Sequence, residues 1–150
     1  MTAFLTRDQE PEGRDLGYSI VYDESLFSYE RAGGIDTYWW KAQEPGKPNC
    51  YLSISRLTGY TLDEAMEGLI LQSGFDGTRS TLVLDGQVTS TFTFAEGTDA
   101  DDAVTQYVCV PLSDGSILLV ELSYYVAAKE TAGQDLQELL HSIPFSTPEN

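Results

Sequence analysis

The sequence predicts an α+β fold in which a mainly antiparallel sheet is covered by two helices. Runs of alternating apolar and polar residues, the pattern of half-buried strands, occupy most of the chain. Glycine-containing turn signals join several of these runs, which favours hairpins. Two stretches have helical spacing, and they do not alternate with single strands in the way that a parallel sheet requires. Antiparallel strands paired through hairpins and covered by two helices make an α+β sandwich.

The N-terminal part predicts a polar segment followed by a first strand. Residues 1–16 are polar and show no hydrophobic period, so we interpret them as a lead-in or tether. Within residues 17–23, Tyr18, Ile20 and Tyr22 recur at every second position. This spacing places the three side chains on one face of a half-buried strand.

Three more strands are expected before the first helix. Residues 27–31 and 35–42 flank Gly33-Gly34 and predict a hairpin, because glycine adopts the positive φ angles of a tight turn without strain. A segment with two prolines and a glycine then interrupts the pattern. Residues 50–57 follow as the fourth strand, in which Leu52 and Ile54 share one face.

The first helix has both a start and a stop signal. Thr61 and Glu64 form a capping box, in which each side chain accepts a hydrogen bond from a free amide of the first turn. Leu62, Met66 and Leu69 then recur at helical spacing. We expect this helix to end at Gly74.

The second half of the chain predicts two hairpins and a terminal helix. Asp85-Gly86 separates the predicted strands at residues 81–84 and 87–94. Asp114-Gly115 separates those at 103–112 and 117–126. A helix is expected at residues 131–141, ended by Pro144. The elements make a single α+β domain over residues 17–146, followed by a short tail at 147–150.

Charge excludes one class of partner. The chain of 150 residues carries 24 acidic and 8 basic side chains, a formal net charge of −16. Binding to nucleic acid requires clustered Lys and Arg, and here no two basic residues are adjacent, so we expect no nucleic acid partner. The charge favours docking of a basic partner, or it serves only to keep the surface solvated. No stretch reaches the roughly 18 apolar residues that a transmembrane helix needs.

The common catalytic groups are few. His141 is the only histidine, and it lies in the last turn of the predicted helix, where a cation is favoured on structural grounds. Cys50 and Cys109 form no CxxC motif and cannot complete a zinc site with one histidine. We expect the two cysteines either to form a disulfide, in an oxidising compartment, or to remain two buried thiols. Paired carboxylates for glycoside hydrolysis occur by chance among so many acidic residues, so a hydrolase stays a second alternative.

One acidic loop supports a metal hypothesis. Asp99, Asp101 and Asp102 offer the hard oxygen ligands that calcium prefers. The segment lacks the EF-hand spacing, including the central glycine and the distal glutamate. A solvated acidic loop is the competing interpretation, and no cofactor is expected.

Clustered aromatic residues are the strongest candidates for a binding surface. Tyr38, Trp39 and Trp40 are consecutive on a predicted strand, so Trp39 must project from the face opposite to the other two. Tyr124 and Tyr125 are likewise consecutive on the last predicted strand, so their rings must also project from opposite faces. These five rings form either a ligand-binding surface, since Trp and Tyr supply contact area with few rotamers, or the two covered faces of a sheet.

Several strings of the sequence resemble the PsbP-like fold family. They are Gly-Tyr-Ser-Ile-Val-Tyr-Asp at residues 17–23, Tyr-Leu-Ser-Ile-Ser at 51–55 before the first helix, and Leu-Leu-His-Ser-Ile-Pro-Phe at 139–145. The resemblance implies a PsbP-like α/β/α sandwich. The family includes the extrinsic photosystem protein, a Ran-binding nuclear import factor and many bacterial domains. More narrowly, the chain looks like the globular part of small lipoproteins of Gram-positive gut bacteria.

The resemblance implies a non-catalytic binding or protein-interaction domain, the soluble part of a bacterial surface lipoprotein. Its partner would be an unknown protein or cell-surface ligand, with a lipid anchor upstream of the given sequence. Such a lipoprotein domain would be extracytoplasmic and membrane-anchored, if the chain is a trimmed fragment. The alternative is a cytoplasmic adaptor or secretion chaperone that binds a partner helix, if Met1 is the native start.

Overall fold

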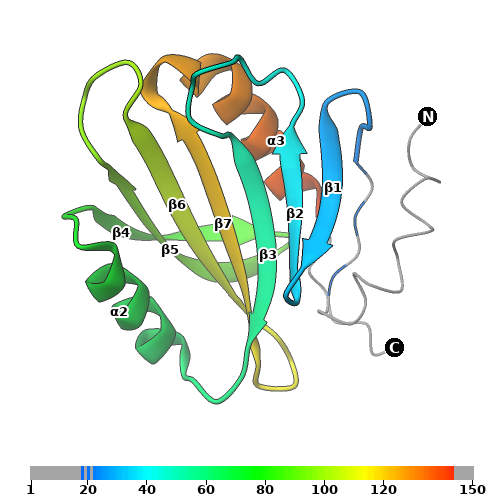
Figure 1. Cartoon of the computed structure of the whole chain (residues 1–150). Coiled ribbons are helices and arrows are strands. Elements are labelled where there is room, and N and C mark those ends of the chain that lie inside the picture. The colour runs from blue at the N-terminus through cyan, green and yellow to red at the C-terminus, as the bar shows by residue number, and fades with distance from the viewer. Residues whose placement is uncertain (1–17, 19, 21, 144–150) are drawn as a thin grey trace.

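A sheet of seven strands dominates the computed structural model, which describes residues 18, 20 and 22–143. The strands are β1 (Phe27–Ala32), β2 (Ile35–Trp40), β3 (Tyr51–Leu57), β4 (Thr78–Leu84), β5 (Gln87–Ala95), β6 (Ala103–Pro111) and β7 (Ile117–Tyr125). Their order is β1-β2-β3-β7-β6-β5-β4, so β7 lies in the centre (Figure 1). Each neighbouring pair is antiparallel. The predicted α+β class is confirmed.

The residues predicted to form the hairpin turns adopt the positive φ angles that such turns require. Gly33 and Gly34 have φ angles of 61° and 79° between β1 and β2. Asp85 and Gly86 have φ angles of 52° and 76° between β4 and β5, as a two-residue hairpin turn requires. Strand β4 begins at Thr78, three residues before the predicted start at 81. Its first residues are exposed at the edge of the sheet, so they show no alternating pattern from which to predict them.

The segment predicted as the first strand is only partly described. Tyr18, Ile20 and Tyr22 do not belong to a strand, but all three side chains are buried. The alternation therefore identified a buried face and not a sheet strand. Tyr18 reaches the sheet through its hydroxyl, which bonds to Asp36 of β2. Residues 17, 19 and 21, the predicted lead-in at 1–16 and the tail at 147–150 lie outside the described residues.

Helix α2 (Leu62–Ser73) starts and stops where the sequence predicts. The hydroxyl of Thr61 accepts a hydrogen bond from the amide of Glu64, and the Glu64 carboxylate accepts one from the amide of Thr61. Gly74 ends the helix in the left-handed conformation, with a φ angle of 75°.

The terminal helix begins less regularly than expected, and its α-helical part is shorter than the predicted span of residues 131–141. It is preceded by a 3₁₀ turn (Val126–Ala128) and a π-helical turn (Lys129–Gly133), and the regular part, α3, spans Gln134–Ser142. Ala132 and Gly133 are buried in the wide turn. A Cβ atom on Gly133 would lie 3.3 Å from the ring of Tyr124, so small residues here let the turn approach the sheet.

The two helices cover opposite faces of the sheet (Figure 1). Leu136 and Leu140 of α3 pack with Leu52, Val120 and Leu122 in the larger hydrophobic cluster. Met66 of α2 packs in a smaller cluster, whose other buried members include Phe92, Phe94, Cys109 and Ile117. Strand β7 supplies alternate residues to both clusters. None of the described helices is long and apolar enough to span a membrane.

Candidate functional site

The five predicted aromatic residues do not form one surface. As the alternation predicts, Tyr38 and Trp40 share a face; they are 1% and 9% exposed in the cluster under α3. Tyr125 is buried in the same cluster, and Tyr124 packs partly buried against it. Trp39 lies half-buried on the opposite face of β2. Trp39 is therefore the one member of the predicted set on the face that α2 covers.

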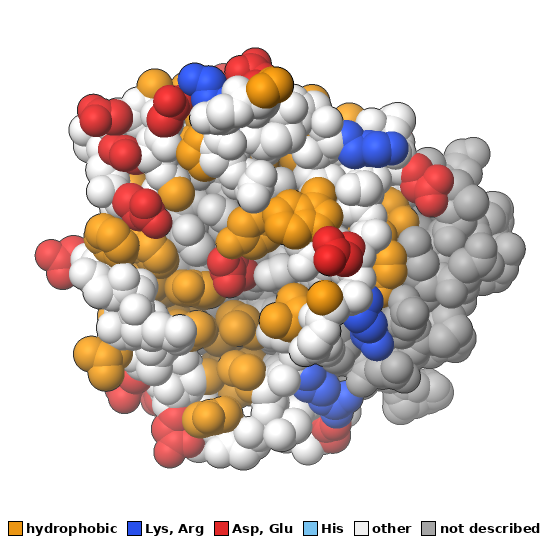
Figure 2. All heavy atoms as spheres, in the orientation of Figure 1, with side chains coloured by type: hydrophobic (Ala, Val, Ile, Leu, Met, Phe, Trp, Pro, Cys, Tyr) orange, Lys and Arg blue, Asp and Glu red, His pale blue; other side chains and the backbone are white. Residues whose placement is uncertain are grey.

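Trp39 belongs to an uncovered part of that face. Four neighbouring strands each contribute one half-buried side chain: Trp39 of β2, Tyr51 of β3, Glu121 of β7 and Tyr107 of β6. We call these four residues the open aromatic face. In Figure 2 hydrophobic side chains gather in the middle of this side of the molecule with acidic side chains beside them. Helix α2 packs against β5 and β6, and Tyr107 of β6 lies partly buried against the cluster that contains Met66 of α2.

Direct contacts hold the members of the open aromatic face in place. The rings of Trp39 and Tyr51 lie with centroids 5.4 Å apart in an edge-to-face arrangement. The Tyr51 hydroxyl donates a hydrogen bond of 2.6 Å to Oε2 of Glu121. The indole Nε1 of Trp39 donates one of 3.0 Å to Oε1 of Glu30. Tyr107 is the register partner of Glu121 and continues the row toward Phe94, with ring centroids 6.0 Å apart.

The two tyrosines of the open aromatic face have raised pKa values. Burial and the hydrogen bond to Glu121 raise the pKa of Tyr51 above its ordinary value. Burial, and then the charge of Glu121, raise the pKa of Tyr107. Both tyrosines are therefore neutral near pH 7, which disfavours a role as nucleophiles, and the Tyr51 hydroxyl donates a hydrogen bond. No ion pair among the described residues involves Glu30 or Glu121.

A groove beside α2 adjoins the open aromatic face. It has a volume of about 270 Å³, and its apolar lining includes Leu57, Leu69 and Leu119. Tyr60, at the rim, is 54% exposed. Leu119 precedes Glu121 by two residues in β7 and so shares its face, which makes the groove and the open aromatic face continuous.

A second hollow lies at the end of the sheet where β2 and β7 finish. It has a volume of about 470 Å³ and is lined in part by Trp40 and Tyr125, which the structure thus brings together. Lys47 on its wall forms an ion pair of 3.1 Å with Asp101. The two rings are buried, so they form the floor of this hollow and offer little surface to a ligand.

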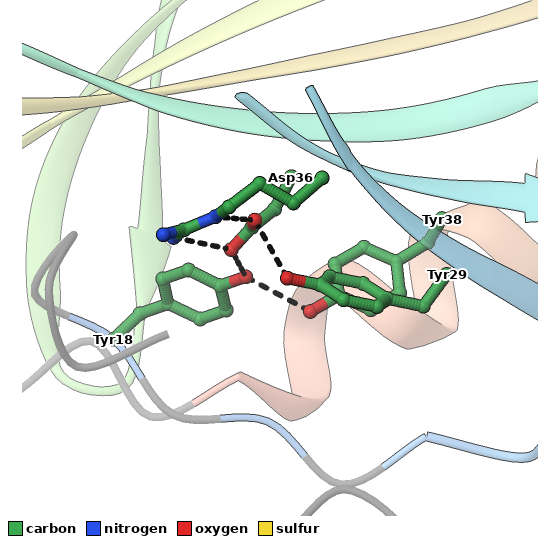
Figure 3. Close-up of polar contacts among 5 residues, drawn as sticks. Tyr18, Tyr29, Asp36 and Tyr38 are labelled. Atoms are coloured by element: carbon green, nitrogen blue, oxygen red, sulfur yellow. Dashed lines mark hydrogen bonds and ion pairs between the residues drawn. The ribbon is translucent and has the colours of Figure 1, made fainter. Parts of the chain in front are cut away.

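A buried carboxylate in β2 organises the polar cluster shown in Figure 3. Asp36 is fully buried. Its Oδ2 accepts a hydrogen bond of 2.5 Å from the Tyr18 hydroxyl, and its Oδ1 accepts one of 2.8 Å from Tyr29. Arg31 Nε lies 2.7 Å from Oδ1 and forms an ion pair with it. The Tyr18 hydroxyl also lies 2.8 Å from that of Tyr38, which ties the segment before β1 to the sheet.

Two of the three predicted calcium ligands contact other groups of the chain through their carboxylates. Asp102 Oδ2 accepts a hydrogen bond of 2.9 Å from the amide of Asp99, and Asp101 pairs with Lys47. In the part of the chain that the structure describes, no group of three or more His, Cys, Asp or Glu side chains is arranged to hold a metal ion.

Neither cysteine nor the histidine is a member of the open aromatic face. Cys50 and Cys109 are buried free thiols in different clusters, on opposite faces of the sheet. Burial raises the pKa of Cys109 to about 11 and also raises the pKa of Cys50. Both thiols therefore stay protonated and behave as small apolar residues. His141 is exposed in the last turn of α3.

Sequence reasoning missed Asp36, Tyr51, Tyr107 and Glu121. The signal for Asp36 was present, because it shares the face of Tyr38 and Trp40 in an alternating strand and a charged residue on a buried face needs partners. Tyr51 was identified only as part of a strand. Finding the row of four residues requires the strand order, which brings β7 between β3 and β6.

Comparisons with known proteins give no family assignment. No protein-family model matches the chain. A search of curated proteins finds no match either. Among solved structures, the chain is similar to cyanobacterial PsbP (CyanoP) from Synechocystis sp. PCC 6803, with a TM-score of 0.42 and 13% sequence identity. The likeness covers 85% of this chain and 92% of that one.

Proposed function

We propose that this chain is a non-catalytic binding domain that docks a partner protein on its open aromatic face. The observation that carries the proposal is the uncovered row of Trp39, Tyr51 and Tyr107 around Glu121. Aromatic residues are enriched at the centres of protein interfaces because they bury much area and lose few rotamers. The neutral tyrosines, whose pKa values are raised, support binding over nucleophilic chemistry.

Site-specific cross-linking in the native cell tests this proposal. A photo-reactive phenylalanine analogue is placed at Thr37, two residues from Trp39 on the same face of β2. The control position is Leu71, which is 84% exposed on α2. We expect a defined protein adduct from position 37 and none from position 71. Equal adducts at both positions, or none at 37, would contradict docking on this face.

A partner helix in the groove beside α2 is the second candidate. The apolar lining by Leu57, Leu69 and Leu119 suits the buried stripe of an amphipathic helix. This occupant fits a cytoplasmic adaptor or secretion chaperone. A cross-linker at Tyr60, on the rim of the groove, distinguishes the two candidates. An adduct from position 60 without one from position 37 would favour the helix-binding function.

We further propose that the domain is the soluble part of a bacterial surface lipoprotein. The support is the resemblance of its strings to small lipoproteins, and an intact-mass measurement on fractions of the native cell tests it. A lipid-modified species in the membrane fraction, with additional N-terminal residues, is the expected result. An unmodified species in the cytosolic fraction would favour the adaptor or chaperone instead.

A further inference from the structure

We propose that the open aromatic face recognises an arginine-bearing segment of the partner, with a guanidinium group held between Glu121 and the rings of Tyr51 and Tyr107. This inference rests on the proposed function and specifies the chemistry of the occupant. It follows from the charge of the face, the geometry of its carboxylates and the rings beside them.

Charge complementarity favours a basic occupant. The residues that β2, β3 and β7 place on this face include no Lys or Arg: they are Ile35, Thr37, Trp39, Tyr51, Ser53, Ser55, Leu57, Ile117, Leu119, Glu121 and Ser123. Glu121 receives one hydrogen bond, from Tyr51, and takes part in no ion pair of the described residues. The whole chain carries a net charge of −16, which attracts a basic segment at longer range.

The rings beside the carboxylate favour arginine over lysine. Tyr51 and Tyr107 come from the strands on either side of β7, so their rings flank Glu121. A planar guanidinium can stack on an aromatic ring while it donates two hydrogen bonds to a carboxylate, whereas an ammonium is a strongly hydrated point charge. The half-burial of Glu121 and both tyrosines reduces competition from water.

A second carboxylate sets the spacing of the occupant. Glu30 of β1 accepts a hydrogen bond from the indole of Trp39 and lies three strands from Glu121. At about 4.8 Å per strand, the two carboxylates stand about 14 Å apart across the sheet. An extended peptide covers that distance in about four residues. The face therefore fits an extended segment with arginines at positions i and i+4.

The probe for the experiment is a capped pentapeptide, acetyl-Arg-Ser-Thr-Ser-Arg-amide, titrated into the ¹⁵N-labelled protein. Two matched peptides replace both arginines by lysine or by citrulline, which keeps the shape of arginine without its charge. The indole N–H signal of Trp39 is assigned by its loss in Trp39→Phe. We expect saturable shifts of this signal with the arginine peptide, weaker binding of the lysine peptide and no binding of the citrulline peptide.

Matched variants test the role of Glu121. Glu121→Gln should lower the affinity for the arginine peptide about five-fold, equal to about 1 kcal/mol of binding free energy. Glu67→Gln removes the same charge from an exposed position of α2 and should change the affinity less than about two-fold. Equal losses in the two variants would overturn the proposal, because net charge alone would then explain the binding. Binding of the citrulline peptide as strong as that of the arginine peptide would overturn it as well.

A second variant keeps the test decisive if Glu121→Gln folds poorly. Ser53 is the register partner of Glu121 across β3 and β7, so Ser53→Arg supplies a guanidinium within the chain itself. This variant should block the arginine peptide, and undiminished binding to it would contradict the proposed site. If position 37 cross-links a partner while the peptide titrations fail, the arginine preference is wrong and the proposed function stands. If the cross-linking fails as well, both are wrong.

Discussion

Replacing Asp36 by asparagine removes one charge from the fully buried centre of the polar cluster. The substitution keeps the shape of the side chain and one acceptor oxygen, but an amide nitrogen takes the place of an oxygen that accepts from Tyr18 and Arg31. Hydrogen bonds to a charged group contribute about 1.5–3 kcal/mol each. The Arg31 side chain is 24% exposed, so water replaces part of its lost partner. We expect a loss of about 3 kcal/mol in the free energy of unfolding.

Urea denaturation followed by circular dichroism measures this loss, and a chain of this size should also melt about 6–12 °C lower. The control is Asp63→Asn, which removes the partner of Arg79 in an exposed ion pair with side chains 82% and 42% exposed. That variant should lose less than about 0.5 kcal/mol. If Asp36→Asn costs less than about 1 kcal/mol, or no more than the control, the cluster does not stabilise the fold as the contacts indicate.

Three further predictions follow from burial and polar contacts. Trp40→Ala should cost about 3–5 kcal/mol in urea denaturation, whereas Trp39→Ala should cost about 1–2 kcal/mol because its ring is half-exposed; equal costs would contradict the two placements. Millimolar calcium should leave the melting temperature unchanged, and an upward shift abolished by Asp101→Ala would show a calcium site after all. Burial raises the pKa of Cys109 to about 11, so between pH 9 and 11 the unfolded thiol releases its proton before the folded one and stability falls as pH rises. Cys109→Ala should lose stability less steeply than the parent chain between pH 9 and 10, and parallel profiles would refute this assignment.

The fold was predictable because its signals are local. Thr61 and Glu64 identified the start of α2, and Asp85-Gly86 identified a hairpin turn whose φ angles are both positive. Local signals failed where burial does not alternate along the chain. The first residues of β4 are exposed on both faces. Tyr18 is the converse case: its alternation with Ile20 predicts a strand, but it lies in no strand and its hydroxyl bonds to Asp36 of β2.

The candidate site was predictable only at Trp39. The alternation in β2 assigns this ring to the face opposite Tyr38, but it does not say which strands lie beside it. Tyr51 and Glu121 are 70 positions apart in the sequence, and their hydrogen bond exists because β7 pairs with β3. No short-range pattern encodes that pairing, so the row of aromatic residues could not be derived before the strand order was known.

The central position of β7 also determines when this protein can fold during its synthesis. The ribosome completes β1, β2 and β3, and then β4, β5 and β6, before it reaches Tyr125 at the end of β7. Until then β3 and β6 both present an edge with unpaired backbone groups, because β7 is the strand that joins them. Such edges are templates for pairing with other chains. A chain that lacks β7 therefore exposes two sheet edges at once, a state that favours aggregation until the last strand is in place.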